Sequence, residues 1–505
     1  MEIPLSKFIL ATMNILLLYP KYPDTYWSFK HALKFISKKA VNIPLGILTV
    51  AAMLPVEWKK KFTDLNVTDL NDKDIIWADF VFISAMSVQM ESVSQIIERC
   101  RLLKTKIVAG GPLFTEEFEQ FPEIDHLVLN EAEITLPPFI EDLKNGHPKK
   151  IYQSALFADM AKTPLPDYSL IKHQEYAGAT IQYSRGCPFD CEFCDITALF
   201  GRQVRTKTSP QIIAELDELL KIGWRGSVFF VDDNFIGHKQ KIKHDLLPAI
   251  IRWMEKKNYP FTFTTEASIN LADDADLMDK MARAGFRKVF VGIETPDESC
   301  LTECNKLQNN NRDLIECVNA IQHYGMEVSA GFIVGFDNDS SNIFERQIDF
   351  IQRSGIITAM VGLLNAPRLS KLYRRLQTEG RIIDNFTGDN TNYSMNFVPI
   401  MDKAELLKGY QKIVHDIYSS KFYYQRVKLY LKQYRPPLGT KKMLTLNDLI
   451  ALLKSVVYIG ILKQNRRYYW YLVLWSIFNK PKAFPMAVTY SIYGYHFRAI
   501  FKNVN

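Results

Sequence analysis

Cysteine is scarce in this chain, which excludes a disulfide-bonded framework. Only seven cysteines are spread over 505 residues, too few for the disulfide-rich class of secreted domains. Residues Met1 to Thr12 are too short and too weakly patterned for a secretory signal, and Met13 is an alternative start. No internal repeat or low-complexity tract is present. With 47% hydrophobic and 23% charged residues, the chain is expected to form about three globular domains in a reducing cytoplasm.

Acidic residues are nearly absent from the last part of the chain. Between Ser419 and Asn505 there are 15 lysines and arginines but one acid, Asp448, so this tail carries +14 and the rest −7. Its aromatic run, Tyr468 to Phe478, has 11 residues, whereas a membrane-spanning helix needs about 20. The charge asymmetry predicts that the tail meets an anionic partner.

Three of the seven cysteines lie close together. Cys187, Cys191 and Cys194 have the spacing C-x3-C-x2-C and follow a strand-like run over 178–184. Three thiolates on one loop can bind three irons of a four-iron cluster and leave the fourth iron open. A structural zinc site needs four closed ligands, and no second pair of suitable ligands lies nearby. The remaining alternative is a set of reduced thiols without a ligand.

This loop resembles the signature of the radical S-adenosylmethionine (SAM) superfamily. The resemblance implies that SAM chelates the open iron and that Phe193, the aromatic residue before the third cysteine, lies against the adenine. It also implies that the reduced cluster cleaves SAM to methionine and a 5′-deoxyadenosyl radical. An electron donor such as flavodoxin or ferredoxin is then an expected partner.

The other cysteines do not predict a second cluster. Cys300, Cys304 and Cys317 lie in or near a helix-like run and have no apparent fourth ligand, and cysteine is often simply buried. The first 150 residues contain only Cys100, which argues against the methylthiotransferases, whose N-terminal domain supplies the ligands of a second cluster.

Two successive alternations of strands and helices organise the chain. The first, over 13–150, predicts a parallel sheet with helices on both faces and ligands at the carboxyl ends of its strands. Its strands are expected at 14–19, 62–70, 79–84, 106–109 and 126–129. A proline-containing connector, 151–176, separates it from the second alternation.

The second alternation, over 177–370, predicts six strand–helix units. Six such units suit a partial (β/α)6 barrel, and the family resemblance supports a barrel over a flat sheet. The strands are expected at 178–184, 227–232, 261–267, 288–294, 327–334 and 357–364. A mainly helical, basic and aromatic region over 371–505 completes an α/β architecture.

Acidic residues end three of the predicted barrel strands. Asp232-Asp233-Asn234 ends the second strand, and Glu266 and Glu294 end the third and fourth. By resemblance to the family, Asp233, Glu266 and Glu294 hold the amino group and ribose hydroxyls of SAM, and the glycine-containing run 331–337 packs near the adenine. The alternatives are helix caps and turn acids for the carboxylates, and a plain buried strand for 331–337.

A doubly wound domain before such a barrel resembles the cobalamin-binding class of the superfamily. The resemblance implies that the strand ends carrying Ser84, Ser87, Gly110 and Gly111 hold the corrin, since glycine lets the backbone approach a ligand closely. The Asp-x-His-x-x-Gly motif that supplies a cobalt ligand elsewhere is replaced here by Pro20–Asp24. Cobalamin is therefore expected without a protein histidine on cobalt; the alternative is a purely structural domain.

Further segments resemble the subfamily that contains the hopanoid C-2 methylases. The matching segments are Tyr19–Lys34, Asn305–Asn309 and Leu372–Arg381, and the resemblance covers the chain from Met13. It implies that the radical abstracts hydrogen from an unactivated carbon and that methylcobalamin supplies a methyl group. The expected substrate is hydrophobic, a lipid such as a hopanoid.

The tail predicts a peripheral position on the inner face of the membrane. Arg466, Arg467, Lys480 and Lys482 flank the aromatic run, as suits a membrane interface. The alternative is a cap of helices over the barrel mouth with solvated lysines. Nucleic-acid binding is disfavoured because no recognisable module is present.

Two rival functions remain open. One is a radical SAM enzyme of non-methylating chemistry. The other is a non-catalytic cobalamin- or membrane-binding protein, against which the intact cysteine triplet argues.

Overall fold

The computed structural model describes residues 12–389, 391–435 and 446–501, which form two compact units. The first unit contains the chain up to Tyr22 together with Pro44–Ile171, and the second contains Pro23–Ile43 together with Lys172 onward. A short segment, 23–43, is therefore part of the second unit although it lies within the first in sequence. Residues 1–11, which precede the alternative start, lie outside the described residues.

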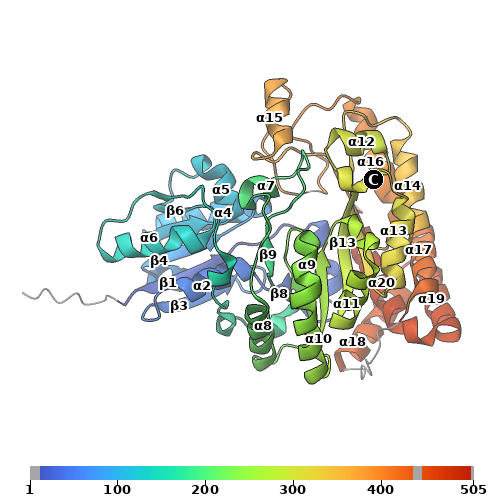
Figure 1. Ribbon diagram of the computed structural model, residues 1–505, viewed down its shortest axis with the longest axis horizontal. Coiled ribbons are helices and arrows are strands. Elements are labelled where there is room, and N and C mark those ends of the chain that lie inside the picture. The colour runs from blue at the N-terminus through green and yellow to red at the C-terminus, as the bar shows by residue number, and fades with distance from the viewer. Residues whose placement is uncertain (1–11, 390, 436–445, 502–505) are drawn as a thin grey trace, which may run out of the picture. The chain divides into compact units, whose positions relative to one another are not determined.

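The first unit is a six-stranded parallel sheet with helices on both faces (Figure 1). Its strand order is β3-β1-β4-β5-β6-β7. The strands are β1 (Asn14–Tyr19), β3 (Lys59–Asp64), β4 (Phe80–Ser84), β5 (Lys106–Gly110), β6 (His126–Val128) and β7 (Ile151–Tyr152). The helices are α2 (Leu45–Met53), α3 (Asp72–Trp77), α4 (Met90–Leu102), α5 (Pro112–Glu117) and α6 (Ala132–Lys144).

The side chains of strand β1 enter two hydrophobic clusters, one on each face of the sheet. Leu16 and Leu18 join a cluster with α3, α4 and α5, whereas Ile15 and Leu17 join one with α2 and α6. All four are fully buried, so the strand is apolar throughout instead of alternating. Each such side chain contributes about 1.5–3 kcal/mol on burial.

Strand β3 does not have the expected bounds. A strand was expected over 62–70, but β3 runs from Lys59 to Asp64 and pairs only with β1. It is an edge strand, and its first three residues are lysines. Exposed charge is common on edge strands because it discourages pairing with other chains, and here it concealed the strand.

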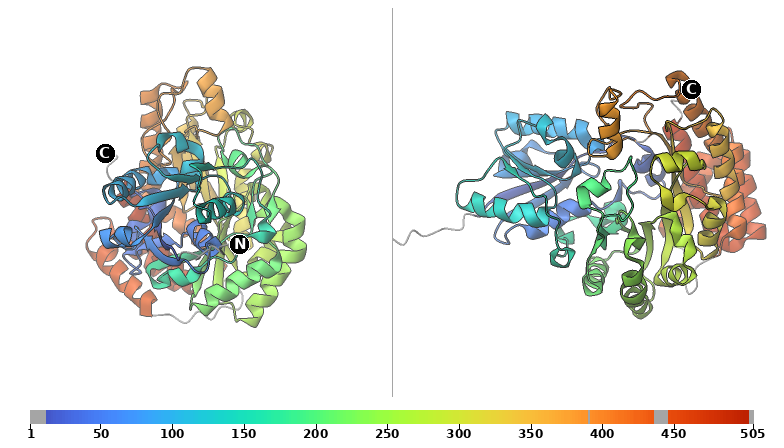
Figure 2. Two further views of the ribbon diagram at one scale, coloured as in Figure 1. Left: turned by 90° about the vertical axis from the view of Figure 1, so that its left-hand side faces the viewer. Right: turned by 45° about the horizontal axis from the view of Figure 1, so that its top comes forward.

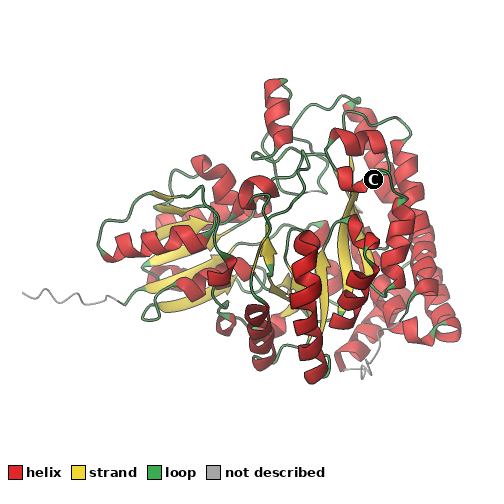
Figure 3. Cartoon of the chain, viewed as in Figure 1, coloured by secondary structure: helices red, strands yellow, loops and turns green. Residues whose placement is uncertain are grey.

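The second unit is a seven-stranded parallel sheet in the order β15-β14-β13-β12-β11-β8-β2, and Figure 3 draws the strands in yellow and the helices around them in red. Its strands are β8 (Tyr176–Ile181), β11 (Gly226–Phe230), β12 (Phe261–Glu266), β13 (Phe286–Glu294), β14 (Glu327–Val334), β15 (Ala359–Leu363) and β2 (Ala40–Asn42). Six strands follow chain order with helices between, which confirms the predicted α/β partial barrel. The intervening helices include α8 (Ser209–Lys221), α10 (Leu247–Lys256), α11 (Ala275–Ala284), α13 (Leu314–His323) and α14 (Ile343–Ser354).

The seventh strand, β2, was not predicted. It pairs with β8 through Ala40 opposite Tyr176 and Asn42 opposite Gly178. The Thr180 hydroxyl donates to the Ile43 carbonyl at 2.7 Å and fixes the end of the segment. A Cβ at Gly178 would lie 2.6 Å from the Asn42 side-chain oxygen and 3.3 Å from the Val41 carbonyl, so glycine lets the two strands approach closely.

Helices make up the C-terminal region, and α17, α19 and α20 lie side by side in Figures 1 and 2. The helices are α15 (Lys371–Thr378), α16 (Lys403–Tyr418), α17 (Ser420–Gln433), α18 (Leu446–Ser455), α19 (Arg466–Asn479) and α20 (Phe484–Ile500). A π-helical turn, Val456–Ile461, continues α18. Among the described residues, no helix combines the length and apolar character that crossing a bilayer requires.

Helix α20 packs against the amino ends of the barrel strands. The Tyr490 hydroxyl donates to Glu327, the first residue of β14, at 2.8 Å, and Glu327 also pairs with Lys288 at 3.4 Å. Because the cysteine loop follows the carboxyl end of β8, this helix lies at the opposite end of the sheet. A cap of tail helices over the mouth that holds the cysteines is therefore wrong for α20.

Candidate functional site

The three cysteines lie on a loop at the carboxyl end of β8, between β9 (Ser184–Arg185) and α7 (Ile196–Phe200). Their thiols form no disulfide; Cys191 is buried, and Cys187 and Cys194 are half-buried. Burial raises the pKa of each thiol, and the neighbouring cysteines raise the pKa of Cys194 further. The loop therefore favours thiols until a metal supplies the positive charge that stabilises thiolates.

The donor set fits an iron–sulfur cluster. Among the described residues, no three Cys, His, Asp or Glu side chains enclose a position for one metal ion. The thiolates of a four-iron cluster bind different irons, so they do not need to converge on one point. The Asn234 amide lies 4.0 Å from the Cys187 sulfur and the Gln308 amide 3.8 Å from the Cys191 sulfur. Such N–H groups tune the reduction potential of a bound cluster.

Backbone contacts brace the loop from several segments. The amide of Glu192 donates to the Cys304 carbonyl, and the amide of Leu372 donates to the Glu192 carbonyl, both at 2.9 Å. The Asn305 side chain donates to the Asp190 carbonyl at 2.9 Å. Residues from the turn after α12 (Glu298–Glu303) and from α15 thus hold the stretch that carries Cys191.

Arg375 on α15 links the loop to the end of β14, and sequence reasoning gave it no role. Its guanidinium contacts Glu192 at 2.7 Å and Asp337 at 2.8 Å, and Arg381 contacts Asp337 at 2.7 Å. Burial raises the pKa of Asp337, but the two arginines outweigh it and lower that pKa overall. Glu192 and Asp337 lie far apart in sequence, so no local motif could reveal this connection.

Asp232 and Asp233 fix the start of the loop. Asp232 is buried, and one of its oxygens accepts from the amides of Tyr183 (2.8 Å) and Ser184, while the other has no partner in the described chain. Asp233 accepts from the Gly186 amide at 3.0 Å. Burial raises the pKa of Asp232 to about 8 and that of Asp233 to about 6.

The Glu266 carboxylate, at the end of β12, has no hydrogen-bond partner within the described residues. Burial, with the nearby charge of Asp233, raises its pKa to about 7. A half-buried carboxylate without a protein partner beside the cysteine loop is suited to accept hydrogen bonds from a ligand.

Glu294, in contrast, already has a partner. It ends β13 in a left-handed conformation (φ 62°) and forms an ion pair with Lys306, which sequence reasoning did not assign. Burial lowers the pKa of Lys306, but Glu294 outweighs it and raises that pKa overall. Lys306 lies 5.8 Å from the Phe193 ring centroid, and Phe193 contacts Phe336 at 6.4 Å. Phe193, the predicted aromatic residue, thus contacts both Lys306 and Phe336, a residue of the 331–337 run.

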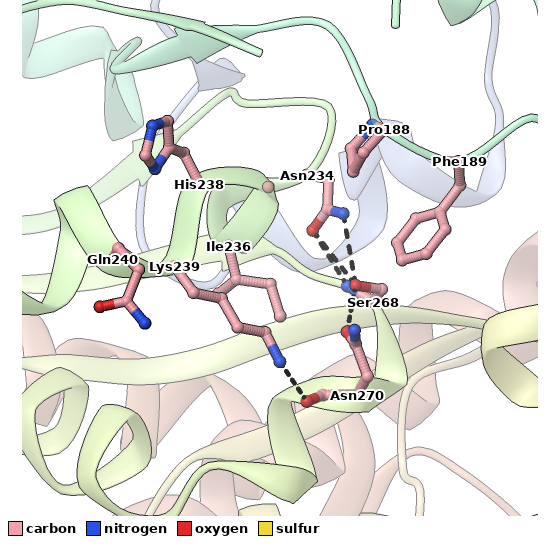
Figure 4. Close-up of a pocket in the computed structure, with 10 residues that line it drawn as sticks. Pro188, Phe189, Asn234, Ile236, His238, Lys239, Gln240, Ser268 and Asn270 are labelled. Carbon is pink, nitrogen blue, oxygen red and sulfur yellow. Dashed lines mark hydrogen bonds between the residues drawn. The ribbon is translucent and has the colours of Figure 1, made fainter. Parts of the chain in front are cut away.

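A pocket of about 420 Å³ opens beside the loop (Figure 4). Asn234 accepts from the Ser268 amide at 3.2 Å, and Lys239 donates to the Asn270 carbonyl at 2.8 Å along its wall. The lining residues are Pro188, Phe189, Asn234, Ile236, Gly237, His238, Lys239, Gln240, Ser268 and Asn270. The pocket lies where the loop meets the segments that follow β11 and β12, at the carboxyl ends of the strands.

The first unit brings Ser84, Gly110 and Gly111 together. Ser84 pairs with Gly110 between β4 and β5. A Cβ at Gly110 would lie 2.5 Å from the Val128 carbonyl, and one at Gly111 (φ +93°) would lie 3.0 Å from the Ser84 hydroxyl. Packing therefore requires glycine at position 110, and at position 111 the positive φ together with close neighbours favours glycine. Ser87 follows on a 3-10 turn, so this edge carries small, uncharged residues that leave the backbone accessible to a large ligand.

Histidines do not occupy this edge among the described residues. His126 begins β6 and His147 precedes β7, so both lie at the amino ends of the strands. His31 belongs to the second unit, where its ring lies 5.7 Å from that of His496. Among the described residues of the first unit, no imidazole lies at this edge, and cobalamin binding without a protein histidine on cobalt stays a prediction.

The remaining barrel cysteines have structural partners. The buried Cys300 thiol lies 3.3 Å from Asp339, and the buried Cys304 thiol donates to the Leu301 carbonyl at 3.6 Å. The SAM roles of Phe193, Asp233, Glu266 and Glu294, and the corrin roles of Ser84, Ser87, Gly110 and Gly111, stay predictions.

Comparison with known families finds three matches along the chain. Residues 181–351 match the radical SAM superfamily, and residues 36–140 match the B12 binding domain. Residues 370–505 match a domain of unknown function, DUF4070.

Full-length relatives are also found. An uncharacterized methyltransferase from Synechocystis sp. is 37% identical over 490 residues, covering 96% of this chain and 91% of the relative. The hopanoid C-2 methylase of Rhodopseudomonas palustris is 33% identical over 473 residues, covering 91% and 88%.

Solved structures support the fold. The radical SAM methyltransferase TsrM from Kitasatospora setae, with cobalamin and a [4Fe-4S] cluster bound, is 14% identical and gives a TM-score of 0.58, covering 79% of this chain and 85% of that one. The cobalamin-dependent SAM radical enzyme OxsB is 16% identical and gives 0.60, covering 98% and 80%.

Proposed function

Because this chain belongs to the cobalamin-dependent radical SAM methyltransferases, we propose that it methylates an unactivated carbon of a hydrophobic substrate, specifically a hopanoid-type lipid. The enzyme uses a [4Fe-4S] cluster, SAM and cobalamin. The observation that carries the substrate proposal is the 33% identity to a hopanoid C-2 methylase along nearly the whole chain. Membership in an enzyme family leaves no need for the non-catalytic alternative.

The proposed roles of the residues follow from the site. When bound, the cluster and SAM supply the radical that removes hydrogen, and cobalamin supplies the methyl group. Cys187, Cys191 and Cys194 hold the cluster. Glu266 accepts from SAM, and the Glu294–Lys306 pair presents both charge signs to the zwitterionic amino-acid end of SAM.

The remaining parts of the proposal concern partners and place. A one-electron donor of the flavodoxin or ferredoxin type reduces the cluster. The corrin binds at the Ser84 and Gly110–Gly111 edge without a protein histidine on cobalt. The enzyme works at the inner face of the membrane, where a water-insoluble substrate is concentrated.

The test uses the anaerobically reconstituted full-length protein with reductant, cobalamin, methyl-labelled SAM and a detergent-dispersed hopanoid. The expected result is 5′-deoxyadenosine together with a labelled lipid heavier by one methylene group. The Cys191→Ala variant, which lacks a cluster ligand, should form neither product. Label that enters a water-soluble acceptor and no lipid would refute the hydrophobic-substrate proposal, and 5′-deoxyadenosine without any methylated product would favour the non-methylating alternative.

A further inference from the structure

Apolar residues are exposed along one helix of the tail that the sequence patterns did not single out. Helix α18 and its π-helical continuation run without a break from Leu446 to Ile461. Its exposed apolar residues include Leu446 (72%), Leu449 (50%), Leu453 (58%), Val457 (45%) and Ile461 (55%). Their spacing of three or four residues places them on one side, while Ala451, Ser455 and Ile459 are buried on the other.

Helix α19 adds a second exposed row. Tyr471, Leu474 and Phe478 are 58%, 47% and 81% exposed, again three and four residues apart. The expected interfacial run over 468–478 is thus only partly outward, because Tyr469, Leu472 and Val473 are buried. The Trp470 ring N–H donates to the Gly460 carbonyl at 2.9 Å and ties α19 to the end of the first helix.

Cations surround these rows without acidic partners. Lys463, Arg466 and Arg467 lie in or beside the turn between the two helices, and Lys480 and Lys482 follow α19. All five are exposed, and none forms an ion pair with any residue in the described ranges. Other tail cations are used internally, as with Arg426, which is buried between the rings of Tyr418 and Tyr423.

We propose that the eight exposed apolar residues form a docking face that enters the interfacial region of an anionic lipid bilayer. The residues of the docking face are Leu446, Leu449, Leu453, Val457, Ile461, Tyr471, Leu474 and Phe478. Apolar side chains enter the acyl boundary and the five cations contact phosphate headgroups. The apolar row runs the whole length of the helix of 446–461, about 24 Å at 1.5 Å per residue, so the helix lies along the membrane surface.

Charge favours lipid over a second copy of this chain. A symmetric dimer through the docking face would bring together two tails that each carry +14. Such like-charge contact opposes association, whereas an anionic bilayer attracts every cation near its surface. The inference rests on the proposed function for one point only, the reason for docking, which is access to a membrane-dissolved substrate.

The experiment is co-sedimentation of the full-length protein with phosphatidylglycerol-containing vesicles and with neutral phosphatidylcholine vesicles. The unchanged protein should prefer the anionic vesicles and lose that preference at high salt, since salt screens charge. The Leu449→Glu/Leu453→Glu variant should lose at least about tenfold in partitioning to both vesicle types. The Arg466→Gln/Arg467→Gln variant should lose about tenfold on anionic vesicles alone.

Matched controls use exposed residues of the first unit. Val56→Glu/Leu102→Glu repeats the apolar-to-acid change at sites 94% and 68% exposed, and Lys59→Gln/Lys73→Gln repeats the loss of two charges. Both controls should bind vesicles as the unchanged protein does. Docking-face variants that bind like their controls would overturn the proposal. A dimer in light scattering that Leu449→Glu/Leu453→Glu dissociates, without vesicle binding, would overturn it in favour of self-association.

Methyl transfer to a detergent-dispersed substrate separates the two proposals. Docking-face variants should keep this activity, because none of their residues lies at the cysteine loop. If the protein binds vesicles but methylates no lipid, the substrate proposal is refuted and the docking-face proposal still holds.

Discussion

The two parallel sheets of this enzyme present opposite chemistry at the carboxyl ends of their strands. The barrel edge holds Cys187, Asp233, Glu266 and the Glu294–Lys306 pair, most of them ionisable and buried or half-buried. The edge of the first unit holds serines and glycines, and its acids are engaged elsewhere: Glu131 and Glu133 accept from the connector residues Ala158 (2.6 Å) and Thr163 (2.9 Å). A charged edge suits a metal cluster and a zwitterion, while a small neutral edge suits a bulky ligand bound through the backbone.

The two edges also differ in how they are held. Ser84 and Gly111 meet across neighbouring strands, a short distance in sequence. Glu192 and Arg375 meet across 183 residues. The barrel edge therefore depends on the complete second unit, and the other edge on local strand packing, so substitutions should separate the two cofactors.

The largest effect is expected from the cysteine loop. Replacing Cys187, Cys191 or Cys194 by Ala should reduce iron from about four per chain to near zero, because two thiolates cannot hold the cluster. Cobalamin binding should persist, since it uses the other sheet. Iron and cobalt analysis after anaerobic reconstitution measures both. Cys300→Ala and Cys304→Ala serve as controls, and iron loss in these two variants would show a second set of ligands.

The reciprocal effect is expected from Gly111→Ala. Its backbone conformation (φ 93°, ψ 179°) is adopted almost only by glycine and costs a residue with a Cβ about 1–3 kcal/mol. Crowding against Ser84 and Ala85 adds about 1–3 kcal/mol. Cobalamin affinity should fall about tenfold or more while iron content is unchanged. The matched control is Gly146→Ala, with a similar φ of +79° and nothing within 4 Å of the added Cβ. If both variants lose cobalamin affinity equally, crowding at Gly111 is not the cause of the loss.

A smaller effect is expected from Arg375→Met. The change removes charged hydrogen bonds to Glu192 and Asp337, each contributing about 1.5–3 kcal/mol, and frees the loop at Cys191. The cluster should still assemble but lose iron to a chelator roughly tenfold faster, which corresponds to about 1.4 kcal/mol. This is less than the sum of the hydrogen bonds because the Arg375 side chain is partly exposed to solvent. Arg374→Met, an exposed neighbour on α15, should match the unchanged protein. Identical chelation rates for the two variants would leave Arg375 without a positioning role.

The smallest effect is expected from Asp232→Asn and appears only with pH. The pKa of Asp232 is raised to about 8 in the folded protein, so the folded state holds a proton that the unfolded state releases. The contribution of Asp232 to the free energy of unfolding is therefore fully present below its unfolded pKa and declines as the pH rises towards 8. The variant should therefore melt like the unchanged protein near pH 5 and at a higher temperature near pH 9. A parallel pH dependence in both would contradict the raised pKa.

Local pattern accounts for some elements and not for others. Strand β14 has the expected bounds, 327–334, because nearly all of it is buried and apolar. Strand β3 was concealed by Lys59–Lys61, and β2 is three residues long with a partner far away in sequence. No local period can reveal a strand defined by so distant a neighbour.

The same division applies to the site. The cysteine triplet is a local motif, so its spacing together with the preceding strand and Phe193 predicts a cluster site from sequence. Lys306 and Arg375 are invisible to spacing, because their roles arise only when separate segments meet at Glu294 and Glu192. The left-handed backbone of Glu294, which sets up its ion pair, is likewise unusual for a non-glycine residue and carries no sequence signal.

Strand β2 also determines the order in which parts of the chain can fold during translation. The chain leaves the first unit after Tyr22, returns at Pro44 and leaves again after Ile171, so no single cut separates two complete modules. During translation, Ala40 must wait for Tyr176, a delay on the order of ten seconds at about 5–20 residues per second. A ribosome-bound fragment ending near Ile171 would therefore carry residues 23–43 without their partner strand. Grafting the first unit onto another barrel would require this segment to be transplanted with the barrel it completes.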